Sequence, residues 1–209
     1  KEIIGPLIDQ IAELSERQEG ITGVPSYFKA LDQLTNGWQE SDLVILAARP
    51  SMGKTAFALN LAYNAAIKSK RPIAVFSAEM SGESLMQRIY ASVAMIPMEH
   101  IQTGFLTSSE KVKFAQAYEE IKDTRLYIDA TPNIMIGDLV AKATKLKASH
   151  DDLGLIVVDY LGIIRTASKT ENRQLEVAKI TQTLKALARD LNVPVIILCQ
   201  INRDAEDNE

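Results

Sequence analysis

The sequence has few of the residues that mark a special environment. Its single cysteine, Cys199, cannot form a disulfide within the chain, which fits a reducing compartment such as the cytoplasm. The apolar runs are no longer than a strand, so no membrane span and no membrane partner are expected. Residues 1–20 lack the basic start and unbroken apolar core of a signal peptide. We therefore expect a globular, cytoplasmic protein.

Excess positive charge is also lacking. The 23 lysines and arginines are outnumbered by 27 acidic residues, which leaves a net charge of −4. Such a balance gives no overall attraction to nucleic acid, so any contact with DNA would have to come from a few local loops. The length of 209 residues and the 46% hydrophobic content are sufficient for one well-buried domain.

From residue 43 onward, strand-like apolar runs alternate with helix-length amphipathic stretches. Strands are expected at 43–48, 73–78, 126–130, 155–160 and 195–200, and helices at 54–69, 82–95, 107–123, 135–148 and 172–192. This alternation, with strands that are apolar throughout, predicts an α/β fold with a parallel sheet covered by helices on both faces. A short amphipathic segment at 27–34, ending at Asn36-Gly37, precedes the first strand.

The stretch "AARPSMGKTAFALN" lies between the first expected strand and a helix. In that position it predicts a phosphate-binding loop, although Ala48 replaces the first glycine of the G-x-x-x-x-G-K-[ST] pattern. Lys54 is placed to reach the β and γ phosphates, and the Thr55 hydroxyl to ligate Mg²⁺. A chance GKT on an ordinary turn is the alternative. The expected nucleotide-binding residues are Arg49, Pro50, Ser51, Met52, Gly53, Lys54, Thr55 and Ala56.

Polar residues end three other expected strands. Asp159 follows "LIVV" and is expected to hold Mg²⁺ together with Thr55. Glu79 could act as the general base for an attacking water, and Gln200 could sense the γ phosphate. Asp159 could instead cap a turn, and Glu79 could simply stabilise the start of the following helix.

Four segments in order give the sequence a family resemblance: "AARPSMGKTAFALN", "FSAEMSGESLMQRIYAS", "LGLIVVDYL" and "ENRQLEVAKITQTLKALARDLNVPVIILCQINR". Over residues 21–203 the chain resembles the C-terminal motor domain of the bacterial and phage replicative DNA helicases, the DnaB family. The resemblance implies a RecA-like P-loop core with strand order 3-2-4-5-1. It also implies ATP–Mg²⁺ hydrolysis, a hexameric ring that translocates on single-stranded DNA and unwinds duplex, and contacts with primase and a helicase loader.

The resemblance assigns roles to particular residues. It makes Lys54 and Thr55 the Walker A pair, Asp159 the Walker B acid, Glu79 the catalytic base and Gln200 the γ-phosphate sensor. Lys54, Glu79 and Gln200 are therefore the expected catalytic residues. Ala48 is usual in the family, whereas Gly162 stands where the family usually has Gln.

The resemblance also divides the chain. Residues 1–20 carry an apolar stripe at helical spacing and would be a linker helix that docks on a neighbouring subunit, or they could fold back on their own core. Residues 21–209 would be the motor core, ending before the family's arginine finger and main DNA-contact segment, so slow turnover is expected. DNA contacts are expected at Arg165, Lys169, Arg173 and Arg203, although basic residues of this kind are often merely solvated.

Three other functions remain open from the sequence. A metabolic P-loop kinase would share the loop, but strand-end Glu79 and Gln200 suit water activation better. A recombinase-like RecA ATPase would share the core. A non-catalytic nucleotide switch that serves as an interaction module would share the loop without turnover.

Overall fold

The computed structural model describes residues 21–159, 161–162, 164–166 and 173–201. Its centre is a five-stranded parallel sheet in the order β1-β5-β4-β2-β3. The strands are β1 (Leu43–Ala48), β2 (Ile73–Ser77), β3 (Leu126–Asp129), β4 (Leu155–Asp159) and β5 (Val195–Gln200). This is the predicted order 3-2-4-5-1 read from the opposite edge, so the RecA-like α/β fold class is confirmed.

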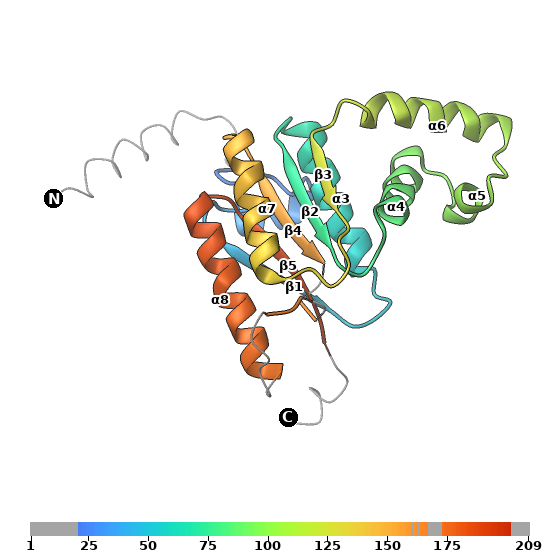
Figure 1. Ribbon diagram of the computed structural model, residues 1–209. Coiled ribbons are helices and arrows are strands. Elements are labelled where there is room, and N and C mark those ends of the chain that lie inside the picture. Colours follow the sequence, from blue (N-terminus) through green and yellow to red (C-terminus); the bar gives the residue numbers. More distant parts are fainter. Residues whose placement is uncertain (1–20, 160, 163, 167–172, 202–209) are drawn as a thin grey trace.

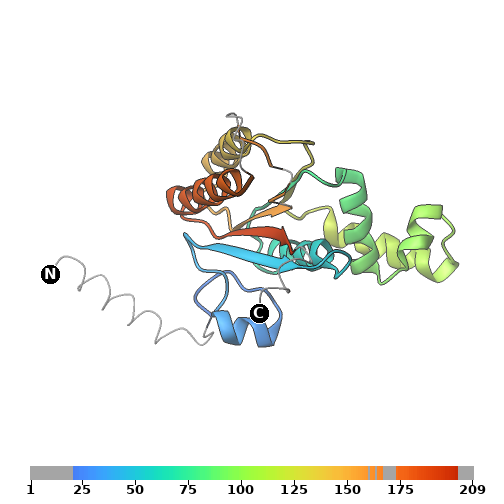
Figure 2. The same cartoon turned by 90° about the horizontal axis from the view of Figure 1, so that it is seen from below.

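Helices cover both faces of the sheet (Figures 1 and 2). One face is covered by α3 (Lys54–Lys68) and α4 (Gly82–Ala94), and the other by α7 (Ile136–Ser149) and α8 (Arg173–Leu191). Alternate residues of the central strands enter the two cores: in β4, Val157 packs with the α3 layer and Val158 with the α7–α8 layer. Burial on both sides explains why the central strands read as uninterrupted apolar runs.

The edge strand β1 departs from that expectation. Its residues alternate between half-buried and exposed at its carboxyl end, and Ile45 is 54% exposed. Within the described part of the chain β1 pairs only with β5, along its whole length from Leu43 opposite Val195 to Ala48 opposite Gln200. The sequence pattern could not distinguish this edge strand from the central strands, because both consist mainly of apolar residues.

Three further helices lie outside the two covering layers: α2 (Lys29–Thr35), α5 (Met98–Thr103) and α6 (Ser108–Ile121). The predicted α2 ends where expected, because Asn36 adopts a left-handed conformation (φ 58°) that closes the helix. Helix α6 begins with a capping box, in which Thr107 and Glu110 each satisfy a backbone N–H of the other. Helix α5 was missed from the sequence because it has only six residues.

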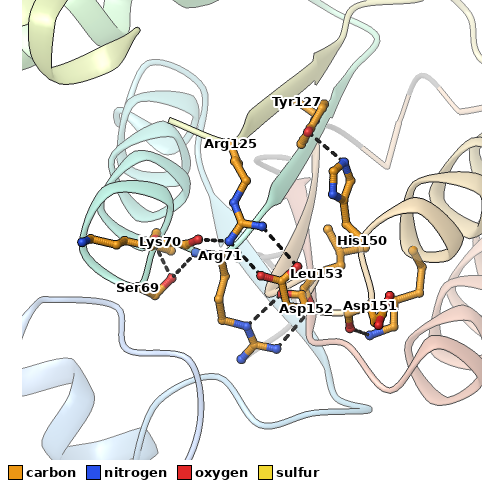
Figure 3. A network of polar contacts seen from close by, with 11 residues as sticks. Ser69, Lys70, Arg71, Arg125, Tyr127, His150, Asp151, Asp152 and Leu153 are labelled. Carbon is orange, nitrogen blue, oxygen red and sulfur yellow. Dashed lines mark hydrogen bonds and ion pairs between the residues drawn. The ribbon is translucent and has the colours of Figure 1, made fainter. Parts of the chain in front are cut away.

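A polar network ties the amino ends of β2, β3 and β4 together (Figure 3). Arg125, just before β3, binds both carboxylate oxygens of Asp152, with Nη2 at 2.7 Å from Oδ2. Arg71, just before β2, donates from Nε to the carbonyl of Asp152 at 3.0 Å and from Nη2 to that of Leu153. The two guanidinium groups therefore fix the chain before β4 to the two neighbouring strands, at the edge opposite the polar strand ends.

None of the helices in the described segments has the length and apolar character needed to cross a bilayer. The expected helix within residues 1–20 lies outside the described residues.

Candidate active site

The polar strand ends meet at a cavity of about 400 Å³ at the carboxyl edge of the sheet. Elements far apart in the sequence build it, since the loop after β1, the start of α3, the end of β2, α4 and the end of β5 all contribute side chains. The cavity is lined by Arg49, Pro50, Ser51, Gly53, Lys54, Thr55, Ala56, Glu79, Met80, Arg88 and Gln200. The structure thus brings together seven of the eight predicted loop residues with Glu79 and Gln200.

The loop after β1 has the backbone of an anion-binding turn. Ser51 (φ 64°) and Gly53 (φ 82°) are both left-handed, and α3 begins directly after Gly53 at Lys54. A Cβ added at Gly53 would meet no atom within 4 Å, so the glycine is required for its conformation and not for space. Met52, the eighth predicted residue, is 72% exposed and does not line the cavity.

Behind the cavity, Thr55 and Asp159 form the predicted pair. The Thr55 hydroxyl donates to Oδ2 of Asp159 at 2.8 Å. The other oxygen of this buried carboxylate, Oδ1, has no hydrogen-bond partner, one of two such buried side-chain atoms among the described residues. Burial raises the pKa of Asp159, while the Thr55 hydrogen bond and the charges of Lys54 and Arg88 act in the opposite direction.

The oxygen atoms of Thr55 and Asp159 suit Mg²⁺, and they do not suit a metal whose ligands all come from the protein. Mg²⁺ is bound through one or two protein oxygens, with phosphate and water supplying the others. Thr55 and Asp159 offer a hydroxyl and an unsatisfied carboxylate oxygen beside a phosphate-binding loop. In the described residues no group of three or more His, Cys, Asp or Glu side chains could hold a metal by itself. The site therefore suits a metal that arrives with its phosphate ligand.

Backbone hydrogen bonds fix the strand ends that carry Glu79 and Gln200. The N–H of Ala78 donates to the carbonyl of Asp159 at 2.9 Å, which ties the residue before Glu79 to the end of β4. The N–H of Ile201 donates to the carbonyl of Ala48 at 3.1 Å, which ties the residue after Gln200 to the start of the loop. Both side chains are exposed and line the cavity. If a phosphate ester were hydrolysed there, the carboxylate could orient the attacking water and the amide could donate to the phosphate.

Arg88 was not identified from the sequence. It lies in the middle of α4, lines the cavity with Lys54, and acts on Asp159 as a positive charge. An arginine on the polar face of an amphipathic helix has no distinctive local pattern, so only the fold reveals its proximity. With Arg49 and Lys54 of the loop, three cationic side chains line one cavity, which suits a ligand carrying several negative charges.

Asp129 also ends a strand at this edge, but its carboxylate is already satisfied. Lys142 of α7 lies 2.6 Å from its Oδ2, and Thr131 donates to its Oδ1 from both its backbone and its hydroxyl. Burial by itself would raise the pKa of Asp129, but the hydrogen bonds from Lys142 and Thr131 and the charge of Lys142 together lower it. Asp129 and Asp159 thus differ in their partners, which separates a structural acid from a candidate metal ligand.

The predicted DNA-contact residues are less concentrated. Arg173 binds Glu176 and donates from Nη2 to the carbonyl of Gly162 at 2.7 Å, so its guanidinium already has protein partners. This arginine, together with the Thr166 N–H, lowers the pKa of Glu176. Arg165 is exposed, and its backbone forms an isolated parallel β-bridge with Met135. Lys169 and Arg203 lie outside the described residues.

Comparison with known proteins agrees with this geometry. The family model for the DnaB-like helicase C terminal domain matches residues 23–209. The chain is 44% identical over 210 residues to the "Replicative DNA helicase DnaB" of Geobacillus stearothermophilus, covering 100% of this chain and 46% of that protein. It is 41% identical over 210 residues to the "Replicative DNA helicase DnaC" of Bacillus subtilis, again covering 100% of this chain and 46% of that protein.

Solved structures agree as well. "The Structure Of A DnaB-Like Replicative Helicase And Its Interactions With Primase" gives a TM-score of 0.88 at 30% identity, over 99% of this chain and 50% of that one. A separately solved ATPase domain gives a TM-score of 0.91, also at 30% identity, over 99% of this chain and 74% of that one. The chain belongs to the DnaB-like helicase C-terminal domain family, and it spans about half the length of the curated relatives it matches. The family resemblance seen in the sequence is confirmed.

Proposed function

We propose that this chain is the ATP-hydrolysing motor domain of a replicative DNA helicase. The observation that carries the proposal is one cavity lined by the loop with Lys54, Thr55, Glu79 and Gln200, with Asp159 behind it and hydrogen-bonded to Thr55. Membership of the DnaB-like family supports it, because the relatives are named replicative DNA helicases. A kinase is less well supported, because Glu79 and Gln200, which line the same cavity, suit the activation of a water.

Each group has a distinct task in this proposal. The loop N–H groups, the start of α3 and Lys54 bind the phosphates of ATP. Thr55 and Asp159 hold Mg²⁺, which when bound neutralises charge that develops on the terminal phosphates. Glu79 orients the attacking water and accepts its proton, and Gln200 hydrogen-bonds the γ phosphate. Arg88 adds a positive charge from α4 to those of Arg49 and Lys54 at the same cavity.

The proposed assembly and partners follow from membership of the DnaB-like family. We propose residues 1–20 as a linker helix, whose stripe Ile4, Leu7, Ile8, Ile11 and Leu14 packs on a neighbouring copy, and residues 21–209 as the motor core. The working form would be a hexamer on single-stranded DNA in the cytoplasm, assisted by primase and a loader. Among the candidate DNA contacts, exposed Arg165 is better placed than Arg173, which already binds Glu176.

Calorimetry of Mg·ATP binding tests the proposal. Lys54→Ala removes a charge-assisted hydrogen bond worth about 1.5–3 kcal/mol, so affinity should fall by about tenfold or more. Lys145→Ala is the matched control, because Lys145 is exposed on α7, away from the cavity. Equal affinity of Lys54→Ala and the parent would show that the cavity is not the nucleotide site.

A further inference from the structure

Helices α3 and α4 are incompletely packed beside the nucleotide cavity. A second cavity of about 240 Å³ lies between parts of these helices, and its lining includes Ala56, Asn60 and Tyr63 from α3 and Arg88, Ala91 and Ser92 from α4. Ala56 and Arg88 line the nucleotide cavity as well. Where part of such a seam is open, polar contacts add to the apolar packing that sets the two helices relative to each other.

A polar bridge crosses this open seam. The Ser92 hydroxyl of α4 donates to Oδ1 of Asn60 at 2.8 Å, and Nδ2 of Asn60 donates to the Ala56 carbonyl at 2.9 Å. Both ends of the Asn60 amide are therefore used, one toward α4 and one toward the first turn of α3. That first turn directly follows the phosphate-binding loop.

Arg88 lies one helical turn before Ser92. Residues four apart in a helix share a face, so the bridge and the guanidinium are on the same side of α4. A long side chain amplifies any rotation of the helix that carries it. Arg88 has an exposed side chain that lines the cavity, and the bridge is a polar contact between its helix and α3, which follows the loop.

We infer that Asn60 and Ser92 are positioning residues that hold Arg88 toward the phosphate groups of a bound nucleotide. The inference rests on the proposed function, since it presumes a nucleotide in the larger cavity. It assigns to the bridge an effect on affinity that passes through Arg88 and through no other group.

A double-mutant cycle tests that route. Ser92→Ala and Asn60→Ala should each weaken Mg·ATP binding by about threefold to tenfold in the parent. In an Arg88→Met background the same changes should have no further effect, because the group they position is gone. Ser92→Thr, which keeps the hydroxyl, should bind Mg·ATP with the affinity of the parent.

Tyr63→Phe is the matched control. It removes a hydrogen bond of 2.9 Å from α3 to Glu120 of α6, which is also an interhelical contact but does not involve α4. It should leave Mg·ATP affinity unchanged. Urea unfolding midpoints of all variants separate a loss of positioning from a loss of fold, and Ser92 is exposed, so its truncation should be tolerated.

Failure of the positioning inference and failure of the proposed function give different results in these experiments. If Lys54→Ala abolishes binding while Ser92→Ala and Asn60→Ala do not weaken it, the nucleotide site stands and the positioning inference is wrong. Equal weakening by Ser92→Ala with and without Arg88 would also overturn it, because the bridge would then act structurally. A parent chain that binds no Mg·ATP would overturn the proposed function and the inference together.

Discussion

Asp159→Asn should have opposite effects on the free chain and on the Mg·ATP complex. In the free chain this buried carboxylate has one oxygen on Thr55 and one with no partner. Removing the charge removes its desolvation cost, so the free energy of unfolding should be unchanged or should rise by about 1–2 kcal/mol. Because the folded-state pKa of Asp159 is raised, any such gain should be largest at pH values above that pKa.

The Mg·ATP complex should respond in the other direction. Mg·ATP at 100 times its dissociation constant should stabilise the parent by about 2.7 kcal/mol, or about 5–10 °C in melting temperature for a domain of this size. The variant lacks the carboxylate that would hold the metal, so its melting temperature should rise no more with Mg·ATP than with ATP and a chelator. Thermal unfolding of both proteins under the three conditions measures this difference.

Asp129→Asn is the control from the same edge of the sheet. Its carboxylate is paired with Lys142, so the variant should lose up to about 1 kcal/mol of stability and keep the full response to Mg·ATP. A full Mg²⁺-dependent shift in Asp159→Asn would refute the metal assignment. A loss of about 3 kcal/mol in the free variant would refute the argument that its charge is unsatisfied.

Two further predictions concern Glu79 and Glu110. Glu79→Gln should keep Mg·ATP affinity within about twofold. Under conditions where the parent assembly hydrolyses ATP, the variant should release phosphate about a hundredfold more slowly or worse. A variant that hydrolyses ATP at the parental rate would show that another residue is the general base. The Thr107 N–H, then the His100 side chain and the Thr107 hydroxyl, lower the pKa of Glu110 from 4.5 to about 2. Its contribution to stability is thus present above pH 4.5 and lost as the pH falls through about 2, so Glu110→Gln should flatten urea-unfolding stability over that range.

The fold could be predicted largely because its signals are local. Each central strand is an unbroken apolar run, and Lys54, Asp159 and Gln200 mark the carboxyl ends of strands or the loop between strand and helix. Parallel strands place their carboxyl ends at one edge, so the meeting of these residues followed from the pattern.

The remainder depended on tertiary contacts. Arg88 reaches the cavity through the packing of α4 beside α3, and no periodicity distinguishes it from other arginines on polar helix faces. Asp129 and Asp159 both follow apolar runs, and only Lys142, brought from α7, shows that Asp129 is already paired. The unsatisfied Oδ1 of Asp159 is likewise a property of the assembled core.

The strand order has a consequence for the time at which the site forms. In the described chain the partner of β1 is β5, although about 150 residues separate Leu43 from Val195. Closing so long a loop is entropically costly, and pairings of high sequence separation form slowly. The phosphate-binding loop follows β1 directly, so we expect its geometry to be complete only after β5 has been synthesised and has docked against β1. Under the proposed function, we therefore expect Mg·ATP affinity to report on whether β5 has docked against β1.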